Sequence, residues 1–187
     1  MKDLNHYQSL SILFRYPSGE LRENIEKCNA ILESYSPDLV RELESFRAHV
    51  RSKTLEFQQE YYTSTFDVQP VSTLDIGYVL FGDDYKRGIF LVNMKREHIK
   101  AGNDCGTDLP DHLPNVLTLL PLIKENELAE ELICSLLIPS ITEMISRFRK
   151  TENHYRSLLE ILLYVMEQDF PASSFERFQF TLKTKVE

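Results

Sequence analysis

The segment Thr107–Pro114 gathers the side chains with the clearest potential for chemistry. It reads Thr-Asp-Leu-Pro-Asp-His-Leu-Pro and brings the carboxylates of Asp108 and Asp111 close to the imidazole of His112. Proline fixes φ and does not continue a helix, so these groups belong to stiff backbone between helices, where binding residues often lie. Two interpretations remain open. One is a binding site, and the other is a helix start with Asp111 as N-cap and Pro114 in the first turn.

Asp111 and His112 could also act together as an acid–base pair, because neighbouring carboxyl and imidazole groups can transfer a proton. No second cluster of histidine and aspartate supports such a site, since the other histidines are scattered along the chain. No glycine-rich phosphate loop and no Glu-x-x-His metal motif occur. The sequence therefore favours a protein that is not an enzyme and has no metal or cofactor of its own. An enzyme using Asp111 and His112 remains the alternative.

A dense aromatic series is the second candidate for function. It consists of Tyr61, Tyr62, Phe66, Tyr78, Phe81 and Tyr85. Aromatic residues are commonly core, but tyrosine hydroxyls need water or a partner and favour the rims of grooves. Aromatic side chains beside Asp111 and His112 would form a groove with an acidic end. Such a groove suits an apolar peptide helix that carries a basic residue.

Size and charge limit the class of protein. The chain has 187 residues, 42% of them hydrophobic, and a formal net charge of −8, which suits one soluble domain. The acidity argues against nucleic acid and favours a basic partner. Three cysteines without a Cys-x-x-Cys pair are typical of a reducing compartment. With no apolar signal core and no long apolar run, the sequence predicts a cytoplasmic protein without a membrane span.

Hydrophobic residues recur at helical spacing along most of the chain, and no stretch alternates with period two. We therefore expect an all-α fold: a single irregular domain over residues 1–187 with about eight to ten helices. Helix starts are predicted at Ser36-Pro37-Asp38 and at Asn153, and a capping box at Ser72-x-x-Asp75. Pro121 and Pro139 should end or kink two later helices. Residues 171–187 are expected to form a short helix or a flexible tail.

Several motifs occur in an order that resembles the assembly chaperones of molybdenum enzymes, the NarJ/TorD/DmsD superfamily, and above all its nitrate reductase delta-subunit branch. The motifs are Leu13–Pro17, Tyr61–Asp67, Ser72–Leu74, Phe81–Asp83, Lys86–Gly88 and Asp108–Pro114, followed by a weaker match at Tyr155–Leu163. The likeness spans roughly residues 10 to 166. The segment Asp108–Pro114 is its most specific part.

The resemblance implies an all-helical cytoplasmic chaperone without enzymatic activity. Such proteins bind the N-terminal, twin-arginine or signal-like segment of a catalytic subunit and hold it while the molybdenum cofactor is inserted. By motif position, the residues that would line or support the peptide groove are Tyr61, Phe66, Tyr78, Phe81, Asp108, Asp111 and His112.

The expected client is nitrate reductase or a related enzyme of the dimethyl sulfoxide reductase family, and cofactor-insertion proteins are possible further partners. The chaperone itself is expected to be a monomer or weak dimer. A general peptide-binding adaptor is the remaining alternative.

Overall fold

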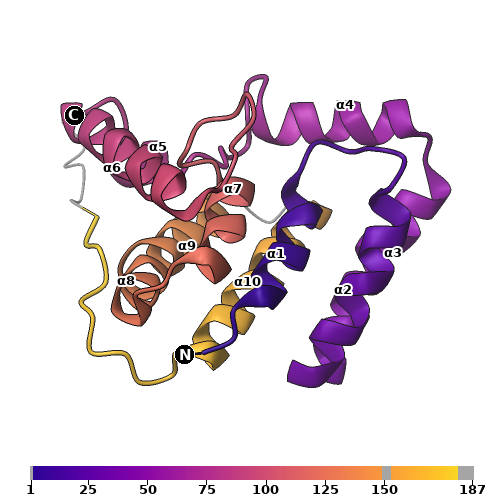
Figure 1. Cartoon of the computed structure of the whole chain (residues 1–187). Helices are drawn as coiled ribbons and strands as arrows, with labels where there is room; N and C mark the ends of the chain where they lie inside the picture. The colour runs from indigo at the N-terminus through magenta and orange to yellow at the C-terminus, as the bar shows by residue number, and fades with distance from the viewer. Residues whose placement is uncertain (1, 149–152, 181–187) are drawn as a thin grey trace, which may run out of the picture.

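Helices form the regular structure of residues 2–148 and 153–180, which are the part of the chain described by the computed structural model (Figure 1). The elements in order are α1 (Asn5–Ser11), η1 (Ile12–Phe14), α2 (Leu21–Tyr35), α3 (Pro37–Ser52), α4 (Leu55–Phe66), α5 (Ile76–Phe81), α6 (Tyr85–Ala101), α7 (Leu113–Leu119), η2 (Leu120–Leu122), α8 (Asn126–Glu131), η3 (Leu132–Leu137), α9 (Ile138–Arg147) and α10 (His154–Asp169). No strand occurs within these two ranges, and the prediction of an all-α fold is confirmed.

The predicted hydrophobic stripes meet in one core. α10 packs against both α3 and α9, α1 packs against α7, and α2 packs against α3. In Figure 1, α1 and α10 lie in the middle of the molecule, with α2 and α3 on one side and α5, α6, α8 and α9 on the other. Large side chains such as Tyr7, Phe46 and Tyr155 are almost completely buried. Burial of this apolar area supplies most of the stability of such a fold.

Local signals in the sequence place several helix ends correctly. The side chain of Ser36 accepts a hydrogen bond from the Asp38 N–H, and that of Asn153 accepts one from the Tyr155 N–H. Gly102 ends α6 in the left-handed conformation, with φ of 69°. α7 ends just before Pro121, so the effect predicted for this proline is confirmed. Caps and breakers act within a few residues, which is why these ends follow from sequence.

The capping box predicted at Ser72 and Asp75 is wrong. The Ser72 hydroxyl donates to the Thr73 carbonyl, and the Asp75 side chain makes no cap bond at the start of α5. Instead, Asp111 caps this helix through the Gly77 N–H, although it lies 34 residues further along the chain. Local spacing could not reveal a cap that comes from a distant segment.

The predicted end of a helix at Pro139 is not observed, because the helical run continues through this residue and changes type just before it. The six residues of η3 form a wide π-helical turn, and α9 begins at Ile138, one residue before the proline. Proline carries no backbone N–H, so it cannot donate to the carbonyl four residues earlier, as an α-helix would require. That carbonyl belongs to Ser135, and it accepts a hydrogen bond from the N–H of Phe178 at 2.9 Å.

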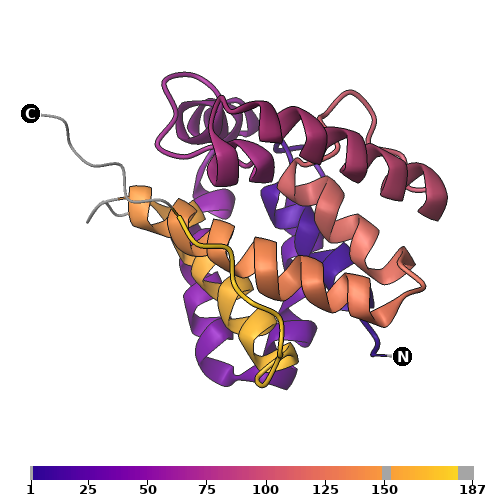
Figure 2. The same cartoon turned by 90° about the vertical axis from the view of Figure 1, so that its left-hand side faces the viewer.

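Residues 171–180 form no helix, so the short helix expected here is absent from this stretch. Figure 2 shows the segment crossing in front of the helices that precede α10. Phe175 and Phe178 pack against the core, while Phe180 is partly exposed. Residues 181–187, for which a flexible tail was also expected, lie outside the described part of the chain.

A polar cluster joins the two ends of the fold. Asp169 at the end of α10 accepts hydrogen bonds from the hydroxyls of Tyr7, at 2.7 Å, and Tyr35, at 2.9 Å. His6 Nε2 lies 2.8 Å from the same carboxylate. Burial alone would raise the pKa of Asp169, but the bonds from His6, Tyr7 and Tyr35 outweigh burial and lower the pKa to about 2. We call His6, Tyr7, Tyr35 and Asp169 the Asp169 cluster.

Candidate functional site

A short antiparallel pairing brings the Asp108–Pro114 motif to the start of α5. The Ile76 N–H donates to the Asp111 carbonyl at 3.0 Å, and the Leu113 N–H donates to the Leu74 carbonyl at 2.9 Å. Asp75 and His112 face each other in this bridge. Two segments distant in sequence thereby form one rigid corner, on which the polar side chains of both are positioned.

Buried side chains form hydrogen bonds to the loop that precedes this corner. His98 of α6, which is 1% exposed, places Nε2 2.8 Å from the Pro110 carbonyl. The Asn115 amide donates to the carbonyls of Cys105 and Leu109. Buried polar side chains thus satisfy backbone groups that no helix supplies with partners. The motif therefore has a fixed geometry rather than that of a free loop.

Asp111 is completely buried beneath this corner. Its Oδ2 accepts the Gly77 N–H at 2.8 Å, whereas Oδ1 has no hydrogen-bond partner among residues 2–148 and 153–180. Burial raises the pKa of Asp111, and the neighbouring carboxylate of Asp75 adds to the rise. The prediction that Asp111 caps the helix after it is wrong, because α7 has His112 at its N-cap position and no side-chain cap. Asp111 supports the corner from inside.

His112 pairs with Asp75 rather than with Asp111. Its Nδ1 lies 3.0 Å from Asp75 Oδ1, and the guanidinium of Arg87 donates to Asp75 Oδ2 at 3.4 Å. The same guanidinium lies over the Tyr78 ring, 5.1 Å from its centroid. Asp111 and His112 therefore make separate contacts, and the geometry gives no support to an enzyme that would use them as one acid–base pair.

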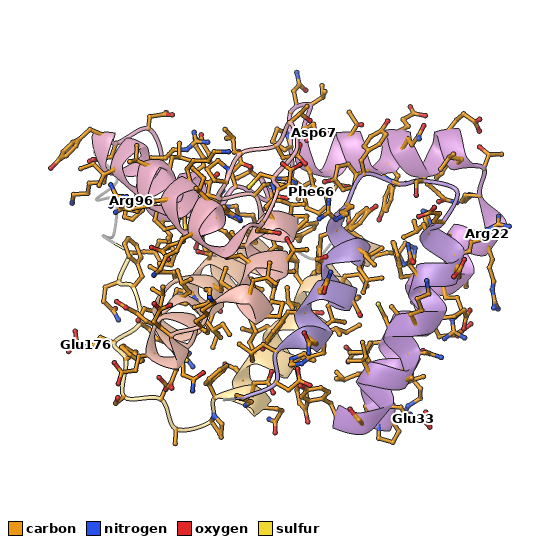
Figure 3. All side chains as sticks on the ribbon, in the orientation of Figure 1. Arg22, Glu33, Phe66, Asp67, Arg96 and Glu176 are labelled. Carbon is orange, nitrogen blue, oxygen red and sulfur yellow. The ribbon has the colours of Figure 1, made fainter. Side chains whose placement is uncertain are left out.

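Two adjoining depressions flank His112 and share Asp67 and His112 in their walls. The first, of about 430 Å³, is lined by Arg15, Tyr16, Tyr62, Asp67, Asp108, His112 and Pro114. The second, of about 410 Å³, is lined by Phe66, Asp67, Pro70, Thr73, Leu74, Asp75, Tyr78, Arg87 and His112. We call the two together the acidic groove. Figure 3 shows Phe66 and Asp67 where the end of α4 meets this part of the molecule.

The charge of the acidic groove is only partly compensated. Asp75 is paired with His112 and Arg87, but Asp67 and Asp108 make no ion pair within the described ranges of the chain. Both are exposed to solvent. Burial of part of Asp67 raises its pKa; the carboxylates of Asp75 and Asp108 add to the rise, and His112 opposes it. A cation entering the groove would relieve this repulsion.

The structure brings four of the seven predicted site residues to the groove wall. These are Phe66, Tyr78, Asp108 and His112. Asp111 lies just beneath them, in contact with Gly77.

The other two predicted residues lie elsewhere. Tyr61 stacks on Tyr155 with ring centroids 5.5 Å apart, and its hydroxyl accepts the His154 N–H. Phe81 lines a different depression, where it contacts Phe178. An aromatic run at helical spacing spreads over several faces of a helix, so its members cannot all face one groove.

Sequence reasoning missed three groups that shape the groove: Asp75, Arg87 and Asp67. The sequence predicts Asp75 as part of a local cap, whereas in the structure it is the partner of His112. Arg87 and Asp67 belong to motifs of the resemblance that imply no role at the site. The pairing of residues 74–76 with residues 111–113 brings Asp75 to His112, and nothing in local spacing predicts that pairing.

Two further features of the described residues bear on function. They include no group of three or more metal-binding side chains arranged around a common point. None of their helices combines the length and the apolar character needed to cross a bilayer.

The fold and the groove define an all-α protein with an acidic, aromatic-edged surface groove. No family model matches the chain. Over 163 residues, which cover 86% of this chain and 88% of the relative, it is 29% identical to the probable nitrate reductase molybdenum cofactor assembly chaperone NarJ of Bacillus subtilis (strain 168). The NarJ-like assembly chaperones are therefore the proteins that the chain resembles over most of its length.

Proposed function

We propose that this chain is an assembly chaperone for a molybdenum enzyme. On this proposal it binds the N-terminal segment of the catalytic subunit in the acidic groove, in the cytoplasm, and holds the subunit while the molybdenum cofactor is inserted. The client is a nitrate reductase or a related enzyme of the same class. The likeness to the NarJ chaperone over most of both chains supports the role.

The single observation that supports the groove as the binding site is its pattern of charge. Asp67 and Asp108 are exposed, lie in the wall of the same depression, and have no cation paired with them in the described part of the chain. Tyr16 and Tyr62 line the same depression. An arginine of the client could form charge-assisted hydrogen bonds to the carboxylates and stack on an aromatic ring. A twin-arginine or signal-like segment offers this chemistry beside an apolar stretch.

Calorimetry with a synthetic peptide tests the proposal. The peptide carries the N-terminal segment of a nitrate reductase catalytic subunit from the same organism, and a second peptide replaces its arginines with glutamine. Asp67→Asn combined with Asp108→Asn should weaken binding of the first peptide by about tenfold, because each lost contact with a charged group is worth roughly 0.5–1.5 kcal/mol at a partly exposed site. The glutamine peptide should bind the parent chain and the double variant equally.

Glu33→Gln is the matched control. It removes one negative charge from an exposed residue at the far end of α2, away from Asp67 (Figure 3). This variant should bind the arginine peptide as the parent chain does. Equal binding by all variants would remove the acidic groove from the proposal, and no binding by the parent chain would contradict the proposed function itself.

A further inference from the structure

A further depression lies beside the acidic groove, and the C-terminal segment of the chain partly fills it. The depression measures about 630 Å³ and is lined by Tyr78, Val79, Leu80, Phe81, Gly82, Asp83, Glu143, Arg147, Phe178 and Phe180. α5 forms one wall, α9 another, and the segment from Phe175 to Phe180 crosses it in extended form. We call this segment the strap. Tyr78 lines both this depression and the acidic groove, so the two adjoin.

The strap is attached by a backbone bond and by aromatic contacts. The Phe178 N–H donates to the Ser135 carbonyl at 2.9 Å, and the Phe178 ring packs edge-on against Phe81 with centroids 5.4 Å apart. The ring of Phe180 packs against that of Phe178 at 5.2 Å. An extended chain bound through its backbone, with aromatic side chains in neighbouring pockets, is a recurring mode of peptide recognition.

The helix beneath is shaped to accept such a segment. Pro139 cannot supply the N–H that the Ser135 carbonyl would receive in an α-helix, and the π-helical turn of η3 surrounds this position. π-helical turns of this kind are frequently found at functional sites. The carbonyl is therefore available to a donor from outside the helix, and the strap supplies that donor.

We propose that this depression is a binding site for an extended peptide segment with aromatic side chains, that the strap occupies it in the free chain, and that the apolar part of a client segment displaces the strap. The competition with a client rests on the proposed function, whereas the binding of the strap to the site does not. The kind of occupant is indicated by the strap itself, in which Phe178 donates its backbone N–H to the Ser135 carbonyl and packs its ring against Phe81. A client that enters the acidic groove reaches this site past Tyr78.

The first experiment measures the strap alone. A chain truncated after Phe170 keeps α1 to α10, the helices of the described residues. It is mixed with a labelled synthetic peptide of residues 171–187, with fluorescence anisotropy as the readout. The peptide should bind the truncated chain and bind the full chain at least several-fold more weakly, because the intact strap competes at high effective concentration. A Phe178→Ala peptide should lose binding. No binding of the parent peptide to the truncated chain would overturn the site.

The second experiment measures competition with a client. The apparent affinity of a ligand falls in proportion to the fraction of chains with a free site. If the strap fills the site in about nine chains of ten, its removal should tighten binding of the nitrate reductase N-terminal peptide by about tenfold. Phe178→Ala in the full chain should give part of this gain and removes no backbone.

Glu176→Gln is the matched control, since Glu176 is an exposed strap residue on the outer side (Figure 3). It should leave the affinity unchanged. If the client peptide binds the parent, truncated and Phe178→Ala chains equally, the competition is refuted while the proposed function stands. If it binds none of them, the proposed function fails, and the anisotropy experiment still decides whether the site exists.

Discussion

Asp111 differs from its acidic neighbours in what its side chain touches. Asp67 and Asp108 face solvent in the acidic groove, and Asp75 is bridged by His112 and Arg87. Asp111 has no exposed surface and caps α5 through Gly77. The acidic residues of the Asp108–Pro114 motif thus have different roles. The Asp111 carboxylate holds the corner together, while Asp108 and His112 line the groove.

Two substitutions of Asp111 should distinguish the contribution of its hydrogen bond to stability from that of its charge. Asp111→Ala loses the bond to Gly77 and should lower the free energy of unfolding by about 1–3 kcal/mol. Asp111→Asn keeps an oxygen for that bond and also removes a buried charge, so it should stay within about 1 kcal/mol of the parent chain near neutral pH. Urea unfolding measures both values, and equal losses for the two variants would contradict the cap.

The raised pKa of Asp111 adds a dependence on pH. Because the folded state holds its proton more tightly than the unfolded state, this residue favours folding below its unfolded pKa, and the benefit disappears as pH rises through the folded pKa. The Asp111→Asn variant has no carboxyl group at this position and lacks this pH-dependent contribution to stability. Relative to the Asn variant, the parent chain should therefore gain stability as the solution is acidified.

α5 is the element on which the site depends most closely, because Asp111, Phe90 and Arg87 all pack against its glycine. A Cβ added at Gly77 would lie 2.7 Å from Asp111 Oδ2 and 2.8 Å from a ring carbon of Phe90. Asp111 cannot yield freely, because its Oδ2 already accepts the hydrogen bond from the Gly77 N–H. Glycine at this position therefore permits the close approach of the corner to the helix.

Gly77→Ala should lower the free energy of unfolding by about 1–3 kcal/mol, because overpacking displaces α5 or the corner. Gly88→Ala in α6 is the matched control. An added Cβ there meets nothing within 4 Å, so the substitution should be neutral or stabilise by up to about 1 kcal/mol through its better helix propensity. Thermal and urea unfolding of both variants provide the comparison. A Gly77→Ala chain as stable as the Gly88→Ala chain would show that the corner is not tightly packed.

At the level of elements, the sequence predicted whatever is determined within one or two helical turns. Hydrophobic spacing predicted the helices, and Ser36, Asn153 and Gly102 marked three of their ends correctly. The wrong predictions at Ser72 and Asp111 have one cause: local spacing predicts a cap from the nearest residues, whereas α5 is capped by Asp111 from a distant segment. The pairing of His112 with Asp75 was missed for the same reason. Contacts fixed by tertiary pairing leave no periodic signal in sequence.

The whole molecule carries an excess of negative charge, which should attract a basic peptide. With a net charge of −8, binding of an arginine-bearing peptide should weaken as salt rises, since exposed charge pairs are screened over about 10 Å at ordinary ionic strength. Calorimetry with the nitrate reductase peptide at low and high salt measures the slope. The slope should flatten in the Asp67→Asn, Asp108→Asn double variant, and an unchanged slope would place the charge recognition elsewhere.

The Asp169 cluster should make stability depend on pH across the whole fold. The folded pKa of about 2 lies below the ordinary value, so the carboxylate stabilises the native state above about pH 4, and this contribution is lost as pH falls toward about 2. Asp169→Asn should therefore cost roughly 2 kcal/mol near neutral pH and progressively less in acid. Urea unfolding over this pH range gives the difference. Glu131→Gln, an exposed substitution in α8, should show no such convergence.

The Asp169 cluster also constrains how the protein is made. The side chains of His6, Tyr7 and Tyr35 lack their shared partner until Asp169 has left the ribosome. α10, which packs on α3 and α9, likewise emerges late. Domains generally fold as units during synthesis, so this fold should remain incomplete until α10 appears. A ribosome stalled shortly before α10 should hold a protease-sensitive chain, and release of α10 should make it resistant.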